Sequence, residues 1–265
     1  MNGNDKWELQ ISEAELRTMT RDLDEAHRET IPTMFDRASN YAEEIAEKDG
    51  KPGGVARRRF LMGAGAAGIG LALAACSSGS GSSGSPSSSA APAKAASPYT
   101  GDLKVVALAT ALENQAIAAY TAALSAAKAG KLGSVPPAVG TFAQTAMSQH
   151  ADHAKAWNGV LSSAGKPTIN NVPLSGQPAV LKALGSVNSV GGVANLALQL
   201  ENQAAQTYLF AEFNVTSAGG IATAATIAPV EAMHAAILYF VLGQYPVPDN
   251  FIAVDKAASA STLTV

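Results

Sequence analysis

Cysteine is nearly absent from this chain of 265 residues, which has one Cys and only 6% aromatic residues. A single cysteine excludes a disulfide framework within the chain and a cysteine-rich zinc site. Charge is scarce too, because only 15% of the residues are charged, against about 25% in an average soluble protein. The formal net charge is −3 and there is no basic patch, which argues against nucleic acid as a partner.

The shortage of charge is confined to one part of the chain. Thirteen of the 21 acidic residues and ten of the 18 basic residues precede residue 60, and no arginine follows residue 59. An acidic arm, residues 1–56, is therefore followed by a charge-poor region. That region is long enough for one domain with a core of its own.

The acidic arm is predicted to form two short amphipathic helices. Ser12 and Glu15 form a capping-box pattern at a first helix start, and Thr30 with Pro32 is typical of a second. The apolar residues that follow fall on one helical stripe: Ile31, Met34, Phe35, Ala38, Tyr41, Ala42 and Ile45. Two interpretations stay open, a chaperone-recognition or partner-binding element and a start codon assigned too early.

Residues 57–76 combine a basic start, an apolar run of small residues and the single cysteine, Cys76. That order is typical of a secretory signal. The apolar run from Phe60 to Ala75 is about 16 residues long, shorter than the roughly 20 that a membrane-spanning helix needs. An uncleaved spanning segment is therefore the weaker alternative.

The two ends of this segment resemble known export motifs. Arg57-Arg58-Arg59-Phe60-Leu61 resembles a twin-arginine signal, and Leu73-Ala74-Ala75-Cys76 resembles a lipobox. The resemblance implies recognition by the twin-arginine export machinery, which carries folded proteins, and a lipid on Cys76. The Ser/Gly/Pro/Ala tract of residues 77–97 has the composition of a flexible tether. We therefore expect a domain anchored to the cell membrane on its extracytoplasmic face.

Residues 98–245 predict a four-helix bundle. The sequence is rich in alanine, which favours helices, and Gly and Pro residues divide it. Residues 166–191 are too long for a turn and are expected to form a crossover, and residues 246–265 form a tail. Two hairpins around one crossover indicate an all-α bundle. The helices are expected at residues 102–129, 137–165, 192–218 and 221–242.

The two predicted hairpins repeat one another. Leu-Glu-Asn-Gln-Ala at residues 112–116 recurs at residues 200–204, 88 positions later. In the second helix of each hairpin, His150-Ala151-Asp152-His153 corresponds to Glu231-Ala232-Met233-His234. A duplicated hairpin is expected to create a pseudo-two-fold site at the centre of the bundle.

Glutamate and histidine are retained at matching positions of the four helices. Glu113 and Glu201 lie among apolar residues, where a lone carboxylate is costly to bury and a shared cation would remove that cost. Residues three apart share a helical face, as Glu231 and His234 do. The same spacing joins the histidines of the second helix. The predicted metal ligands are Glu113, His150, His153, Glu201, Glu231 and His234.

This set resembles the ligands of the ferritin-like family of di-iron carboxylate bundles, in particular its exported members. That family uses one Glu from each of two helices and a Glu-x-x-His motif from each of the other two. The resemblance covers residues 98–245 and implies Glu113 and Glu201 as the single carboxylates. It implies Glu231 with His234 as one complete motif.

The other motif departs from the family pattern. His153 matches its histidine, but His150 stands where the family has a Glu that bridges the two metals. The three Glu and three His that remain form a more nitrogen-rich set. The resemblance favours iron, whereas imidazole also suits zinc and copper, and a modified iron or manganese pair or a single ion stays open. Asp152 points about 100° away from His153 on the helix and is not expected to replace the Glu.

Tyr120 and Tyr208 lie nearly two turns after the single glutamates and on the same helical face. Two interpretations of these tyrosines stay open. Each donates a hydrogen bond to a ligand carboxylate or acts as a redox-active phenol, or both are core tyrosines with satisfied hydroxyls.

The leading functional hypothesis is an extracytoplasmic metal-binding protein. The resemblance implies reaction with oxygen or peroxide or the handling of iron, and any enzyme activity would be that of an oxidoreductase with a dinuclear site. The competing hypothesis is a non-enzymatic lipoprotein that serves as an accessory or binding module of an envelope complex, with an envelope protein as its partner. The missing Glu at His150 motivates this second hypothesis.

Overall fold

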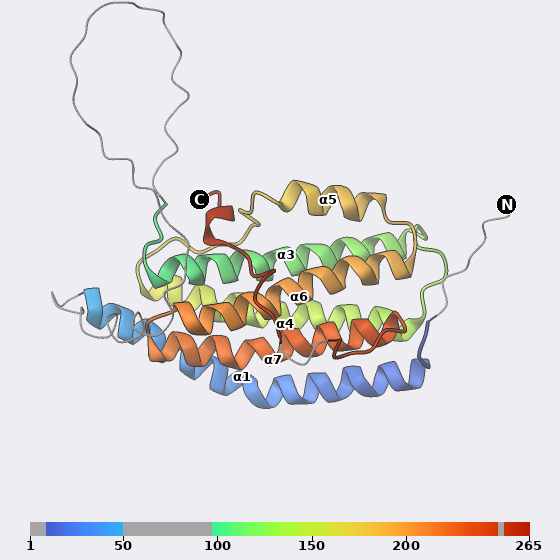
Figure 1. The fold of residues 1–265 in the computed structure, drawn as a ribbon, viewed down its shortest axis with the longest axis horizontal. Helices are drawn as coiled ribbons and strands as arrows, with labels where there is room; N and C mark the ends of the chain where they lie inside the picture. The colour runs from blue at the N-terminus through green and yellow to red at the C-terminus, as the bar shows by residue number, and fades with distance from the viewer. Residues whose placement is uncertain (1–8, 50–96, 249–251) are drawn as a thin grey trace, which may run out of the picture.

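The structure is a computed structural model that describes residues 9–49, 97–248 and 252–265. The described part is helical and contains no strand beyond one isolated bridge (Figure 1). Cys76 and the predicted export motifs lie outside the described residues. The elements are α1 Glu13–Asp49, α3 Asp102–Lys128, α4 Pro137–Ser163, α5 Gln177–Ser186, α6 Val190–Asn214, α7 Ala218–Val241 and the 3-10 helix η1 Ala260–Thr262.

The predicted all-α bundle of two hairpins and one crossover is confirmed. α3 packs against α4, α6 packs against α7, and α3 and α6 join the two hairpins. Gly130 and Gly165 follow the ends of α3 and α4 with φ of 72° and 64°, the left-handed conformation that glycine adopts without steric cost. α6 ends at Asn214, earlier than the predicted residue 218.

The crossover contains a helix that was not predicted. α5 packs across α3 and α6 and covers one side of the bundle (Figure 1). The C-terminal tail returns to this side, where Thr264 N donates to the Pro173 carbonyl oxygen and Ala258 N donates to Thr207 Oγ1. α5 and the C-terminal tail therefore cover the α3–α6 side of the bundle.

The prediction of two short helices in the acidic arm is wrong, because α1 is one helix of 37 residues. The capping box is present at its start, where Glu15 N donates to Ser12 Oγ and Ser12 N donates to Glu15 Oε2. Pro32 lies inside the helix on its exposed face. The carbonyl that proline leaves without a partner therefore faces solvent, and the helix continues.

α1 packs against both α4 and α7 and covers the opposite side of the bundle from α5 (Figure 1). Its apolar stripe is buried there, including Met34, Tyr41 and Ile45. A Cβ atom on Gly219 would lie 2.8 Å from the Tyr41 backbone, so the glycine permits a close approach of α1 to α7. Glu44 accepts hydrogen bonds from Ser217 Oγ and Gly219 N at the same crossing.

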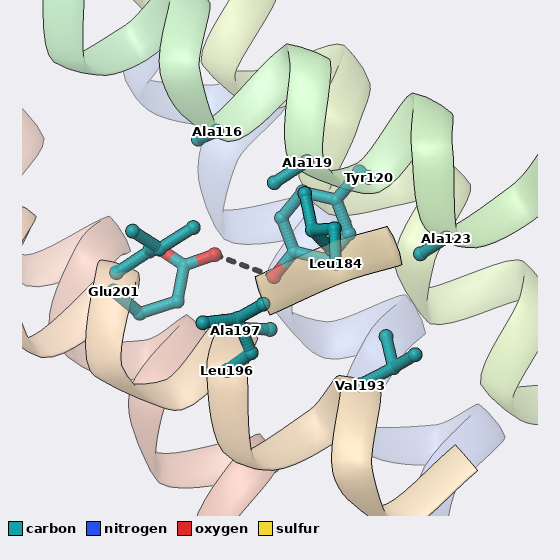
Figure 2. Close-up of a pocket in the computed structure, with 10 residues that line it drawn as sticks. Ala116, Ala119, Tyr120, Ala123, Leu184, Val193, Leu196, Ala197 and Glu201 are labelled. Carbon is teal, nitrogen blue, oxygen red and sulfur yellow. Dashed lines mark hydrogen bonds between the residues drawn. The ribbon is translucent and has the colours of Figure 1, made fainter. Parts of the chain in front are cut away.

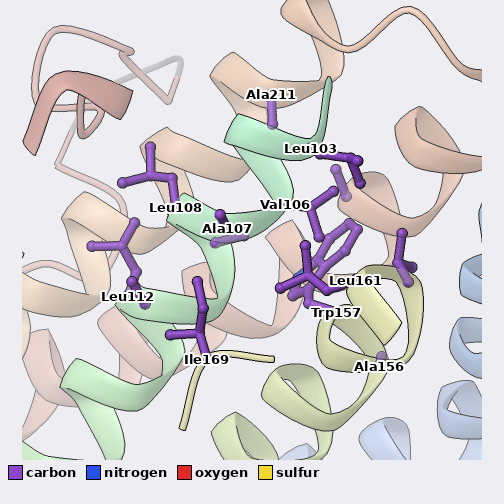
Figure 3. Close-up of a cluster of buried hydrophobic side chains, with 14 of the residues drawn as sticks. Leu103, Val106, Ala107, Leu108, Leu112, Ala156, Trp157, Leu161, Ile169 and Ala211 are labelled. Carbon is purple, nitrogen blue, oxygen red and sulfur yellow. The ribbon is translucent and has the colours of Figure 1, made fainter. Parts of the chain in front are cut away.

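The largest apolar cluster fills one end of the bundle around Trp157, Leu161 and Leu103 (Figure 3). Within the described residues, α7 is the single helix long and apolar enough to cross a membrane. Half of its most apolar stretch of 18 residues is buried in the bundle. α7 also carries Glu231 and His234, which are fully buried. The apolar side chains of α7 thus pack inside the bundle beside the buried Glu231 and His234.

Candidate metal centre

The bundle brings the six predicted ligands together at its centre. Their ligand-type atoms form two groups that share His150 and Glu231, and within each group all atoms lie within 4.8 Å of one another. Every one of these side chains is buried, with an exposed fraction of 2% or less. The groups are Glu113, His150, His153 and Glu231, and His150, Glu201, Glu231 and His234.

His153 and His234, the two outer histidines, each belong to one ligand group and face a carboxylate through the Nδ1 atom. His153 Nδ1 lies 2.9 Å from Glu231 Oε1 and 3.5 Å from Glu113 Oε2. His234 Nδ1 lies 3.3 Å from Glu201 Oε2 and 3.6 Å from Glu231 Oε2. Glu231 therefore presents one oxygen to each histidine, as expected from a carboxylate placed between two sites.

His150 occupies the middle of the cluster. Its Nδ1 atom lies 2.7 Å from Glu113 Oε2, and its Nε2 atom lies 3.2 Å from Glu201 Oε1. The ring centroid is 5.0 Å from that of His234 and 6.1 Å from that of His153. The residue that departs from the Glu-x-x-His pattern thus reaches both halves, as Glu231 does.

The two tyrosines bind the carboxylates crosswise. Tyr120 OH donates to Glu201 Oε1 at 2.5 Å, as Figure 2 shows, and Tyr208 OH donates to Glu113 Oε1. Each tyrosine therefore orients the glutamate of the other hairpin. Trp157 Nε1 donates to Tyr208 OH at 2.8 Å, a contact that the sequence did not predict. The ring of Tyr120 also stacks on that of His150, with centroids 5.9 Å apart.

Two further polar residues at the centre were not predicted. Gln149 is buried and its Oε1 atom lies 2.8 Å from His234 Nε2. His27 comes from α1, and its ring centroid lies 5.2 Å from that of His153. His27 Nε2 lies 3.5 Å from Asp152 Oδ2, so Asp152 faces α1 and stays outside the ligand groups. The only sequence signal for Gln149 was its place one residue before His150, and His27 had none.

Burial and neighbouring charges shift the pKa values of the predicted ligands in opposite directions. Burial alone would raise the pKa of Glu113, but His153 and His150 lower it to about 2. Burial alone would lower the pKa of His153, but the carboxylates of Glu113 and Glu231 raise it to about 9. The pKa values of His150 and His234 are raised by the same kind of contact with glutamates. Without a metal, protons on the histidines balance the carboxylates.

Several buried atoms of the centre nevertheless lack a hydrogen bond. Within the described residues these are both oxygens of Glu231, both ring nitrogens of His153, both ring nitrogens of His27 and the side-chain nitrogen of Gln149. A buried polar atom without a partner requires an explanation such as an ion. Carboxylate oxygens and imidazole nitrogens, aimed inward from four helices, are a donor set that transition metals accept. The residues therefore fit a metal.

Comparison with known proteins bears on the helical region that carries these residues. The sequence model of a family described as "Ferritin-like domain" matches residues 101–244, more than half of the chain. No curated protein matches the chain, and no solved structure matches it. The matched range spans α3, α4, α5, α6 and α7 and contains all six predicted ligands.

Proposed function

Because the chain belongs to the ferritin-like domain family, we propose that it is a membrane-anchored, extracytoplasmic protein that binds one or two transition-metal ions at this centre. The observation that supports the proposal is that three Glu and three His side chains from four helices are buried together at the centre of the bundle. Glu231 supports it further, because neither of its buried oxygens has a hydrogen bond although histidine nitrogens lie near both.

Each ligand group has a distinct place in the proposed centre. Glu113 and His153 would hold one ion, Glu201 and His234 would hold the other, and Glu231 contacts both groups. The hydroxyls of Tyr120 and Tyr208 hold the single glutamates in position. Hydrogen bonds of this kind to ligands affect metal affinity strongly.

When bound, a redox-active ion would supply electrons to oxygen or peroxide, so oxidoreductase activity is the proposed chemistry. A cavity of about 50 Å³ is lined by apolar side chains, with Tyr120 and Phe142 among them. This apolar lining favours a small uncharged reactant. Phe142 packs edge-on against His234, with centroids 6.4 Å apart. Iron is the proposed metal, with manganese, zinc and copper as alternatives that the three histidines also suit.

Elemental analysis of the purified full chain tests metal binding. After reconstitution with Fe, Mn, Zn or Cu, the chain should hold up to two ions, and the Glu231→Gln variant should hold fewer. Glu212→Gln is the control, because Glu212 is on α6 outside both ligand groups. A chain that stays metal-free after reconstitution would overturn the proposal. Oxygen or peroxide consumption by the loaded protein then tests the chemistry.

One observation favours the alternative of a non-enzymatic module in an envelope complex. The three histidines and three glutamates already pair with one another, which balances the buried charge without an ion. Under this alternative, Glu231→Ala should leave capture of an envelope partner unchanged and the phenotype intact. A joint loss of metal content and function in that variant would exclude it.

Membrane anchoring is a separate part of the proposal and rests on the sequence alone. Replacing Cys76 with Ser should release the protein from membranes, whereas unchanged retention would favour an uncleaved spanning segment. Cleavage before Cys76 would also separate α1 from the bundle, because α1 precedes that residue. The intact mass of the membrane-extracted chain distinguishes these forms: a lipid-bearing chain beginning at Cys76 supports the lipobox, and a chain that still contains residues 13–49 contradicts it.

A further inference from the structure

We infer that His150 joins two metal ions directly, with Nδ1 bound to one and Nε2 to the other, in place of the carboxylate that the Glu-x-x-His pattern would supply. This inference rests on the proposed metal centre and adds how its two ions are connected. The geometry behind it is that the two nitrogens of His150 face different ligand groups, Nδ1 toward Glu113 at 2.7 Å and Nε2 toward Glu201 at 3.2 Å.

The ring of His150 is held in this orientation from several sides. It is fully buried, so neither nitrogen reaches solvent. Tyr120 stacks on one face of the ring, and the same tyrosine donates its hydroxyl hydrogen to Glu201, the carboxylate opposite Nε2. His234 and His153 flank the ring at centroid distances of 5.0 and 6.1 Å. The ring of His150 therefore lies next to one histidine from each ligand group.

Formal charge is consistent with a shared His150. Three carboxylates leave two divalent ions one negative charge short of neutrality, which is costly in a buried centre. If His150 bound both ions as an imidazolate, with both of its ring protons released to solvent, it would supply the missing negative charge. No electrons are transferred in this step.

The spacing of the ions separates this arrangement from a carboxylate-bridged one. Carboxylate-bridged two-metal sites place their ions about 3.5–4 Å apart. An imidazole ring between the ions places them on opposite sides of the ring and therefore farther apart. Glu231, which presents one oxygen to each group, would remain as a second connection.

Copper(II) is a suitable probe because each isolated ion gives an electron paramagnetic resonance signal, and an imidazolate couples two such ions. The full chain loaded with copper(II) should bind two ions, lose the signal from most of the bound copper, and show no copper–copper distance of about 3.5–4 Å by X-ray absorption. In His150→Gln, whose amide cannot bridge through two nitrogens, a larger share of the bound copper should give the signal than in the wild type. In His150→Glu, the short distance should appear.

The outcomes separate failure of this inference from failure of the proposed function. Two ions about 3.5–4 Å apart in the wild type, or a single bound ion, would overturn the bridging role of His150 and leave metal binding intact. Two ions that are not coupled would overturn it as well. A wild-type chain without metal would instead overturn the proposed function itself. The wild-type measurements suffice even if both variants fail to fold.

Discussion

Tyr208 illustrates how single residues hold the centre together. Its hydroxyl donates to Glu113 on the other hairpin and accepts a hydrogen bond from Trp157. Tyr120 makes the matching contact with Glu201 without a tryptophan donor. The pseudo-two-fold arrangement of the two halves is therefore broken at the residues that surround the ligands.

Replacing Tyr208 with Phe should weaken metal binding and destabilise the fold. Loss of the hydroxyl leaves Glu113 Oε1 without its donor and Trp157 Nε1 without its acceptor. Each buried group left unpaired costs about 1–3 kcal/mol. Loss of a hydrogen bond to a ligand lowers metal affinity about 10–100-fold. Chelator competition and urea unfolding measure the two effects. Tyr120→Phe is the matched control and should lose affinity with a smaller loss of stability. Equal losses of stability would contradict the role assigned to Trp157.

The metal-free protein should be most stable near neutral pH. His153 has its pKa raised to about 9, so its contribution is complete below about pH 6.5, the ordinary value, and is lost as the pH rises toward 9. Burial and the neighbouring His153 lower the pKa of His27 to about 4, so stability also falls as the pH drops below about 6.5.

Thermal unfolding of the metal-free chain across this pH range measures both effects. His27→Gln cannot gain a proton, so it should flatten the fall between about pH 6.5 and 4.5 and leave the alkaline side unchanged. Bound metal requires deprotonated histidines, so loading should remove the alkaline loss. An alkaline loss that is the same in loaded and metal-free protein would contradict the assignment of His153 as a ligand.

At the scale of elements, α1 is held against the bundle by a glycine contact. The predicted helices leave a gap at the Gly219-Gly220 pair, and the structure places this pair in the first turn of α7. Tyr41 packs against both glycines so closely that a Cβ on either would lie within 3.0 Å of it. A pair of glycines is typical both of a turn between helices and of a close approach of two helices. The sequence alone therefore does not distinguish the two.

Replacing Gly219 with Ala should destabilise the protein by about 1–3 kcal/mol, because the added Cβ meets the Tyr41 backbone and forces α1 away from α7. Gly159→Ala on α4 is the control. No atom lies within 4 Å of the Cβ position there, and alanine should stabilise the helix by about 0.5–1 kcal/mol. Urea unfolding of the full chain measures both changes. A stabilising Gly219→Ala would show that α1 does not pack as described.

The elements that the sequence predicts well are those whose ends are marked. Proline at the start of α4 and glycines after α3 and α4 define helix ends locally. α1 was divided wrongly because whether Pro32 ends a helix depends on which face it occupies in the fold. α5 was missed because its ten residues form a helix within a segment rich in turn signals.

At the scale of the whole molecule, two helices that the bundle pattern did not predict cover its two open sides. α5 lies over α3 and α6, and α1 lies over α4 and α7 (Figure 1). α1 brings His27 next to His153, so the centre is enclosed by a segment far away in the sequence. Helical spacing predicted which Glu and His share a face. It could not predict the crosswise tyrosine bonds or His27, because those depend on how separate helices pack.

Anomalous X-ray diffraction from crystals of the full chain loaded with iron or zinc tests the central claim most directly. The account predicts anomalous peaks inside the bundle at metal–nitrogen distances of about 2.0–2.1 Å from Nδ1 of His153 and from Nδ1 of His234, with Glu231 beside both. Crystals that show no peak among these side chains, or peaks confined to the surface, would contradict the account.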